Sequence, residues 1–226
     1  MLPSPANPIA RATLWQMHDV EIVLVRHGQQ IPLDQRSDDQ VTDPPLTEIG
    51  ERQIEAVADH LAGEEITAVY ASTLERAHRT GEAIAARHGL DVTRVHEIRE
   101  VEVLGRPGPV SDAADIDPIV WSGGGERFVH TGRWDSFPLA ESSDDFRRRV
   151  GRGIEGIVAR HPEGKIVIAC HGGVINAYVA EILGIDRDYF FRAMHCSVHR
   201  VVARHERRVV WNLNETHHLT GDLRTA

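Results

Sequence analysis

Two apolar runs, each ending in a histidine and a glycine, constrain the fold of this chain more than any other feature. Residues 22–25 form a β-branched run that stops at Arg26 and His27, and residues 165–170 form a second run that stops at His171. Short apolar runs of this kind are typical of buried parallel strands. Open α/β sheets bind ligands at the carboxyl ends of such strands. If the two strands are neighbours, both imidazoles face one site.

Strand and helix patterns alternate along the rest of the chain. Thr47 and Ser72 are suited to the N-caps of two helices, the first ending at Gly63 and the second running through about Ala86. Either Ser142 or Ser143 is suited to cap a third helix. The other expected elements are a helix at 174–183 and strands at 66–71, 92–95, 198–203 and 209–213, the last two as an edge hairpin. This order predicts a three-layer α/β/α sandwich with a mostly parallel central sheet, built by residues 19–226 as a single domain.

Residues 106–138 interrupt the alternation. The segment has no hydrophobic periodicity and is rich in glycine and proline, with glycines 123–125 as a predicted hinge. Long irregular segments inside a compact domain usually form lids or substrate caps. Its aromatic residues Trp121, Phe128 and Trp134 favour an ordered cap over disorder. We therefore expect an irregular cap insertion that selects the substrate.

Composition and charge exclude several classes of partner. The formal net charge of −9 argues against nucleic acid as the main ligand. No apolar run approaches the roughly 18 residues that a membrane span needs. The proline-rich residues 1–18 lack the apolar core of a secretory signal and are predicted to be a disordered leader, with Met17 an equally good start. Two cysteines fit a reducing compartment, so we expect a cytoplasmic protein, and a homo-oligomer is compatible with the sequence.

Three further features have structural interpretations. Cys170 precedes His171, but residues alternate faces along a strand, so Cys170 is predicted to be a core residue that points away from the site. Arginines 147–149 fan around a helix and are interpreted as a solvated face. The histidines contain no recognisable zinc spacing, although His217 and His218 are candidates for adventitious metal binding.

The residues expected at the strand ends form a basic cluster that suits phosphoryl transfer. Arg26 and Arg76 match a phosphate group through their planar guanidinium forks, and the helix after the second histidine adds amide donors at Gly172. Arg76 lies in the first turn of a helix, where a cation is disfavoured unless an anion compensates it. His27 is the candidate nucleophile, and a carboxylate near Glu100 is the candidate proton donor. Because side chains supply the positive charge, no metal or cofactor is required.

Six motifs in order resemble those of the histidine phosphatase superfamily, in its phosphoglycerate-mutase-like branch. The resemblance implies that His27 is phosphorylated, that Arg76 binds phosphate, that Glu100 is the acid and base, and that His171 is the second histidine of the site. It covers roughly residues 20–105 and 138–218. The matching segments are Leu24–Gln29, Asp43–Gly50, Ser72–Thr80, Ile98–Glu100, Glu141–Ser142 and Cys170–Gly173.

The chain departs from the family pattern after Ile98–Glu100, the segment that resembles the family's L-R-E motif. Gly105 follows Glu100 by five residues, one more than is usual in the family, so Glu102 is a second candidate for the acid. The extra arginines of the mutases are not recognisable, which favours a phosphomonoesterase acting on a small molecule. A phosphoglycerate mutase, and a catalytically silent phospho-ligand or protein-binding module, remain alternatives. The residues expected to line the substrate pocket are Gln29, Glu102, Arg106 and Arg127.

Overall fold

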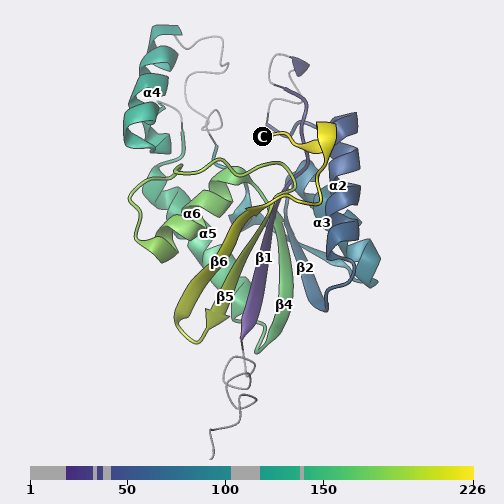
Figure 1. Cartoon of the computed structure of the whole chain (residues 1–226). Helices are drawn as coiled ribbons and strands as arrows, with labels where there is room; N and C mark the ends of the chain where they lie inside the picture. The colour runs from purple at the N-terminus through teal and green to yellow at the C-terminus, as the bar shows by residue number, and fades with distance from the viewer. Residues whose placement is uncertain (1–18, 33–34, 38–41, 103–117, 138–139) are drawn as a thin grey trace, which may run out of the picture.

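The computed structural model describes residues 19–32, 35–37, 42–102, 118–137 and 140–226, apart from the side chains of residues 118–122. The leader predicted over residues 1–18 lies outside this part. A six-stranded sheet with the order β3-β2-β4-β1-β5-β6 forms the centre of the molecule (Figure 1). The strands are β1 Val20–Arg26, β2 Ile66–Ser72, β3 Val92–Val95, β4 Gly164–Cys170, β5 Val198–Arg204 and β6 Arg207–Glu215.

The sheet is parallel except at one edge. Strand β4 pairs in parallel with β1 and with β2, and β2 pairs in parallel with β3. Strand β5 runs antiparallel to β1 and forms a hairpin with β6 at the edge. The predicted mostly parallel sheet and its edge hairpin are confirmed.

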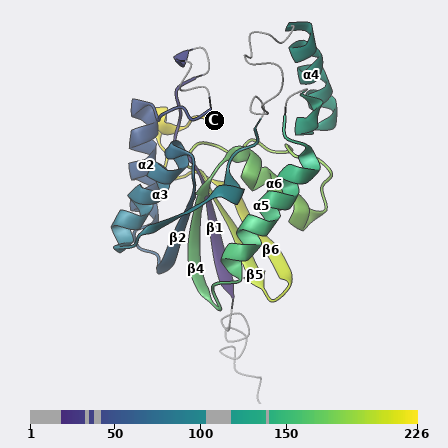
Figure 2. The ribbon, with the colours of Figure 1, turned by 180° about the vertical axis from the view of Figure 1, so that it is seen from behind.

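Four helices cover the two faces of the sheet (Figures 1 and 2). Ile22 and Leu24 of β1 pack with α5 and α6, whereas Val23 and Val25 pack with α2 and α3. Successive strand residues face opposite sides, so one apolar run serves two cores and the predicted three-layer sandwich is confirmed. Among the described helices, none combines the length and apolar character that a transmembrane span requires. The four helices are α2 Glu48–Leu61, α3 Glu75–His88, α5 Ser143–Val158 and α6 Gly172–Leu183.

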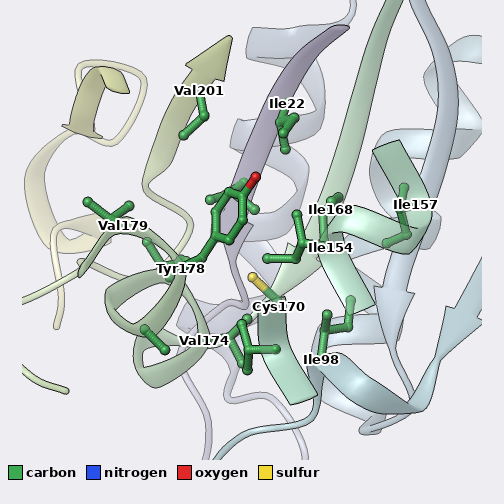
Figure 3. Packing of buried hydrophobic residues seen from close by; sticks show 14 of the residues in the cluster. Ile22, Ile98, Ile154, Ile157, Ile168, Cys170, Val174, Tyr178, Val179 and Val201 are labelled. Carbon is green, nitrogen blue, oxygen red and sulfur yellow. The ribbon is translucent and has the colours of Figure 1, made fainter. Parts of the chain in front are cut away.

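Cys170 belongs to the core between the sheet and α5 and α6. Figure 3 shows its sulfur in the same apolar cluster as Ile154 and Val174. The side chain is fully buried, and burial raises the pKa of the thiol far above its usual range. A buried thiol that does not ionise is a poor nucleophile. The interpretation of Cys170 as a core residue is therefore confirmed.

Two of the predicted helix caps are correct. Thr47 Oγ1 accepts a hydrogen bond from the amide of Gly50 at 3.0 Å, at the start of α2. Ser142 Oγ accepts from the amide of Asp145 at 3.1 Å, at the start of α5. Helix α2 ends at Leu61, with Ala62 rather than Gly63 as its C-cap residue.

Helix α3 begins later than the sequence predicts. Ser72 is the last residue of β2, and α3 begins at Glu75 with Leu74 in the N-cap position. The carboxylate of Asp43 accepts hydrogen bonds from the Glu75 amide at 3.1 and 3.0 Å. An anion at a helix N-terminus satisfies free amides and the helix dipole. The prediction of Ser72 as the cap is wrong because a loop distant in sequence supplies this anion.

The cap insertion is not irregular throughout. Helix α4 spans Pro118–Thr131 and includes the three glycines predicted as a hinge. A Cβ on Gly124 would lie 2.9 Å from Cδ1 of Phe137, so glycine is what lets this aromatic ring approach the helix. Phe128 packs on Trp134 with ring centroids 4.6 Å apart. This aromatic packing outweighs the weak helix propensity of glycine, whereas residues 103–117 lie outside the described chain.

Only one of the three consecutive arginines lies on a solvated face. Arg147 Nε donates to the buried carboxylate of Asp188 at 2.6 Å. Arg149 pairs with Glu141 through Nε and NH2, each at 2.7 Å. The predicted solvated face is therefore wrong for two of the three, because their partners come from other segments of the chain.

Candidate active site

The two histidine–glycine motifs meet because β1 and β4 are neighbours. The register pairs Arg26 with Cys170, so His27 and His171 follow at the same edge of the sheet. Their ring centroids lie 5.1 Å apart. His27 is 2% exposed and His171 is 0% exposed. The structure thus brings both imidazoles to one place, as the sequence predicts.

His27 is held in one tautomer. Its Nδ1 lies 2.7 Å from the carbonyl oxygen of Gly28, and because a carbonyl only accepts, Nδ1 carries the proton. Nε2 keeps its lone pair, which accepts a hydrogen bond from Nε of Arg76 at 3.3 Å. Burial, followed by the charge of Arg76, holds the pKa of His27 well below its usual value. A neutral imidazole with an available lone pair is what nucleophilic attack needs.

Two glycines allow the loop after β1 to pass close to α2. A Cβ on Gly28 would lie 2.6 Å from the carbonyl oxygen of Gly50, and a Cβ on Gly50 would lie 2.1 Å from that of Gln29. The Gln29 amide also donates to Oε1 of Gln53 at 2.7 Å. Glycine at both positions therefore fixes where the chain leaves β1, and with it where His27 lies.

Two guanidinium groups flank His27, that of Arg76 buried and that of Arg26 partly buried. Arg76 is 5% exposed, and its NH1 lies 3.2 Å from Oδ1 of Asp43. Asp43 is therefore the anion that compensates a cation in the first turn of α3. Arg26 donates through NH1 to the carbonyl of Ala193. These partners fix both arginines independently of any ligand.

Glu100 lies in the segment after β3, and its carboxylate contacts the start of α6, next to the same cluster. Its Oε2 accepts a hydrogen bond from the amide of Gly173 at 3.1 Å. A Cβ on Gly173 would lie 2.3 Å from Oε1 of Glu100, so glycine is required for this approach. Burial lowers the pKa of Arg26 and of Arg76, and Glu100 is the strongest opposing charge on each. The negative charge of Glu100 therefore acts on both arginines.

Arg149 anchors the segment that carries Glu100. Its NH1 donates to the carbonyls of Glu97 and Arg99, each at 2.8 Å, and its NH2 donates to that of Glu100 at 3.2 Å. By contrast, the Glu102 side chain is 43% exposed and pairs with Arg99 at 3.5 Å. The structure thus brings Glu100 into the cluster and leaves Glu102 toward solvent.

The other predicted pocket residues make local contacts. The side chain of Gln29 accepts a hydrogen bond from Oγ1 of Thr47 at 2.8 Å. Arg127 donates to the carbonyl of Ser136 at 2.8 Å, within the cap. Arg106 lies outside the described residues. No described contact brings Gln29 or Arg127 to the histidine pair.

Sequence reasoning missed His195, a third imidazole at the site. Its ring centroid lies 5.8 Å from that of His27, and its Nε2 lies 3.0 Å from NH2 of Arg26. Because a guanidinium only donates, Nε2 accepts and Nδ1 donates to Oγ1 of Thr225, at 2.8 Å. His195 precedes β5, which begins beside the end of β1 because the two strands are antiparallel. The position of His195 just before this strand was the available signal in the sequence, since the residue belongs to no recognisable motif.

Buried histidines make the folded state sensitive to acid. Burial, with a further contribution from Arg26, lowers the pKa of His195 and of His199 to about 3 each. In the unfolded chain each ring takes up a proton near its ordinary pKa of about 6.5. Below that pH the unfolded state therefore binds more protons than the folded state, and stability falls as the pH falls.

We expect the free energy of unfolding to decrease by about 1.4 kcal/mol per pH unit for each such ring below about pH 6.5. Urea unfolding followed by tryptophan fluorescence between about pH 7 and about pH 5 measures this slope, above the range where ordinary carboxylates titrate. The variant His199→Gln should have a shallower slope, whatever its absolute stability. A slope that is flat, or that His199→Gln leaves unchanged, contradicts the expectation.

The cluster is chemically suited to a tetrahedral anion. Within the described residues, Nε of Arg26 and both ring nitrogens of His171 are buried without a hydrogen-bond partner. Buried polar groups are normally paired, so such atoms indicate where a ligand binds. Two guanidinium groups, an imidazole and the Gly172 amide at the start of α6 together match the oxygens of a phosphate group.

Comparison with known proteins agrees with this chemistry. The model of the histidine phosphatase superfamily (branch 1) matches residues 22–216. The chain belongs to the histidine phosphatase superfamily. A curated relative, the probable phosphoglycerate mutase GpmB of Yersinia pestis, is 26% identical over 184 residues, which cover 80% of this chain and 84% of the relative.

Solved structures of the superfamily's fold include both mutases and phosphatases by name. A phosphoglycerate mutase from Bacillus anthracis superposes with a TM-score of 0.72 at 17% identity, covering 90% of this chain and 96% of its own. A mycobacterial glucosyl-3-phosphoglycerate phosphatase superposes with a TM-score of 0.70 at 23% identity, covering 87% of this chain and 99% of its own. At these identities the likeness establishes a shared fold.

Proposed function

We propose that this member of the histidine phosphatase superfamily is a metal-independent phosphomonoesterase that acts through a phosphohistidine on Nε2 of His27. The observation that carries the proposal is the hydrogen bond from Nδ1 of His27 to the Gly28 carbonyl. It directs the lone pair of Nε2 toward the arginine cluster, where a phosphate group would bind. The buried location keeps that nitrogen unprotonated.

In the first step Nε2 of His27 attacks phosphorus, and the bond from phosphorus to the leaving oxygen breaks as the new N–P bond forms. Arg26, Arg76, His171 and the amide of Gly172 hold the equatorial oxygens, where charge is stabilised in the transition state. Glu100, when protonated, gives its proton to the leaving oxygen.

In the second step a water molecule attacks the phosphorus of phosphohistidine. Glu100, now ionised, accepts the proton of that water, and the N–P bond breaks to release inorganic phosphate and neutral His27. The contact of Glu100 with the Gly173 amide and its charge effect on both arginines support this assignment over the partly exposed Glu102. The cations are side chains, so the reaction as written needs no metal.

A phosphoglycerate mutase is the second candidate, favoured by the name of the Yersinia relative. A mutase must keep phosphohistidine from water while the substrate reorients. The sequence lacks recognisable counterparts of the arginines that mutases add, which favours hydrolysis.

Because both cysteines are free and buried, the cytoplasm suits the enzyme.

The test is the release of p-nitrophenol from p-nitrophenyl phosphate in the presence of EDTA, run beside an isomerisation assay with 3-phosphoglycerate. We expect hydrolysis that EDTA does not reduce, and isomerisation that is much slower. Faster isomerisation than hydrolysis would assign the chain as a mutase. Inactivity toward both, and toward a panel of small phosphomonoesters, would favour a silent binding module.

A further inference from the structure

Three potential metal ligands meet away from the arginine cluster. His60 lies in the last turn of α2, Glu215 is the last residue of β6, and His217 follows in the next segment. One ligand atom from each lies within 4.8 Å of the others, the one such group of three among the described residues. His60 Nε2 is 2.6 Å from Oε1 of Glu215, and His217 Nδ1 is 3.9 Å from the same oxygen.

The carboxylate of Glu215 is oriented by its neighbours. Its Oε2 accepts hydrogen bonds from Asn212 Nδ2 at 2.8 Å and from Arg200 Nε at 3.3 Å. Oε2 is therefore held by these two hydrogen bonds, whereas Oε1 faces the imidazoles of His60 and His217. Neighbouring groups usually orient a metal ligand in this way.

The His60 ring is also held in place. It stacks on His218 with centroids 4.6 Å apart and planes at 7°, and it meets the edge of His217 at the same centroid distance. His218 is itself fixed, because its Nε2 lies 2.9 Å from the carbonyl of Cys196. The side chains of His60 and Glu215 are 18% and 14% exposed, whereas His217 is 70% exposed. An ion there would keep a coordination position open to solvent.

The net charge around His60, Glu215 and His217 is compatible with a bound cation. Arg200 contacts Glu215 but also pairs with Glu64 and Glu21, each at 2.7 Å, and Lys165 pairs with the same two glutamates. Two cations and three carboxylates give a net charge of −1 before any ion binds. The positive charge of Arg200 is thus already compensated.

We propose that His60, Glu215 and His217 bind a divalent transition-metal ion, with Zn²⁺ as the best fit. Two imidazoles and one carboxylate are a common zinc ligand set that leaves a fourth position for water. Zinc at about 2.0–2.1 Å from each atom in tetrahedral geometry needs ligand atoms about 3.3 Å apart. The observed separations are 2.6 Å for His60 and 3.9 Å for His217, each measured to Oε1 of Glu215. An ion would therefore need His60 and Glu215 to move apart by about 0.7 Å and the exposed His217 to approach by about 0.6 Å.

A metal here would join α2 to the chain after β6. Leu219 follows in that segment and is fully buried in the cluster beneath α2 and α3. Further on, Thr225 contacts His195 and Gln53. Binding to the folded state alone stabilises it by mass action, so the ion should raise the melting temperature.

The test uses the full chain, stripped with EDTA and dialysed, with Zn²⁺ as the probe for affinity and Co²⁺ as the probe for absorption. Isothermal titration calorimetry should give one high-affinity ion per chain. The variants His217→Ala and His60→Ala should each weaken binding by at least about tenfold, whereas His130→Ala, an exposed histidine of α4, should not. Zinc should raise the melting temperature of the wild type and leave that of His217→Ala unchanged. Loading with Co²⁺ should give a visible absorption band that His217→Ala loses.

His217→Ala decides the proposal even if His60→Ala folds poorly, because His217 is exposed. Wild-type affinity in His217→Ala would mean that zinc binds elsewhere, and the absence of binding to the wild type would mean that the three residues form only a hydrogen-bonded cluster. Either result overturns the proposal. Neither bears on the proposed phosphatase, whose assay contains EDTA.

Discussion

Replacing His27 with alanine is expected to lower kcat/KM for p-nitrophenyl phosphate by at least about 10⁴-fold, the order of loss seen when a covalent nucleophile is removed. The arginines should still bind the substrate, so the loss should lie in kcat and much less in KM. The reason is local: Nε2 of His27 is the unprotonated imidazole nitrogen that accepts from Arg76. The control is His88→Ala, which removes a histidine at the far end of α3.

The same pair of proteins tests the covalent intermediate directly. Rapid quenching of wild type with a ³²P-labelled phosphomonoester should trap label that is lost in acid and retained in alkali, as expected of an N–P bond. His27→Ala should retain none, and His88→Ala should match the wild type. Equal labelling of wild type and His27→Ala would overturn the assignment of the nucleophile.

Replacing Glu100 with glutamine is expected to lower kcat by about 10²–10⁴-fold, the usual contribution of a general acid or base. With p-nitrophenyl phosphate the leaving group needs little protonation, so the first step should survive better than the hydrolysis of phosphohistidine. The variant should therefore release a burst of p-nitrophenol, followed by slow turnover. With an alkyl phosphate, whose leaving group needs a proton, both steps should slow and the burst should disappear.

The matched control is Glu102→Gln, a partly exposed carboxylate two residues away. It should retain activity to within about threefold, because exposed ion pairs contribute little. Oε2 of Glu100 accepts from the Gly173 amide and Oε1 from the Val101 amide, so Gln at position 100 keeps one of the two acceptors. A melting temperature equal to that of the wild type would show that the loss of activity reports on proton transfer and not on the fold. If Glu102→Gln loses as much as Glu100→Gln, or more, the acid has been assigned to the wrong residue.

Much of the fold was predictable because its signals are local. The apolar runs before His27 and His171 identified two buried strands, and Thr47 and Ser142 identified two helix starts. The cap segment was misread for the opposite reason. Three glycines argue against a helix locally, but the contacts of Phe128 and Gly124 with aromatic rings beyond the helix outweigh that preference.

The candidate site divides in the same way. Sequence alone named His27, Arg76 and His171, because each follows a strand or lies at the start of a helix, where local pattern fixes direction. Glu100 was named from the resemblance of Ile98–Glu100 to the family's motif. Tertiary structure alone decided that Asp43 caps α3, that Glu100 rather than Glu102 joins the arginines, and that His195 contacts Arg26. The meeting of His60 with Glu215 was equally invisible, since 155 residues separate them. Strand and helix patterns are short-range properties of the chain, whereas these contacts exist only after the sheet has brought distant segments together.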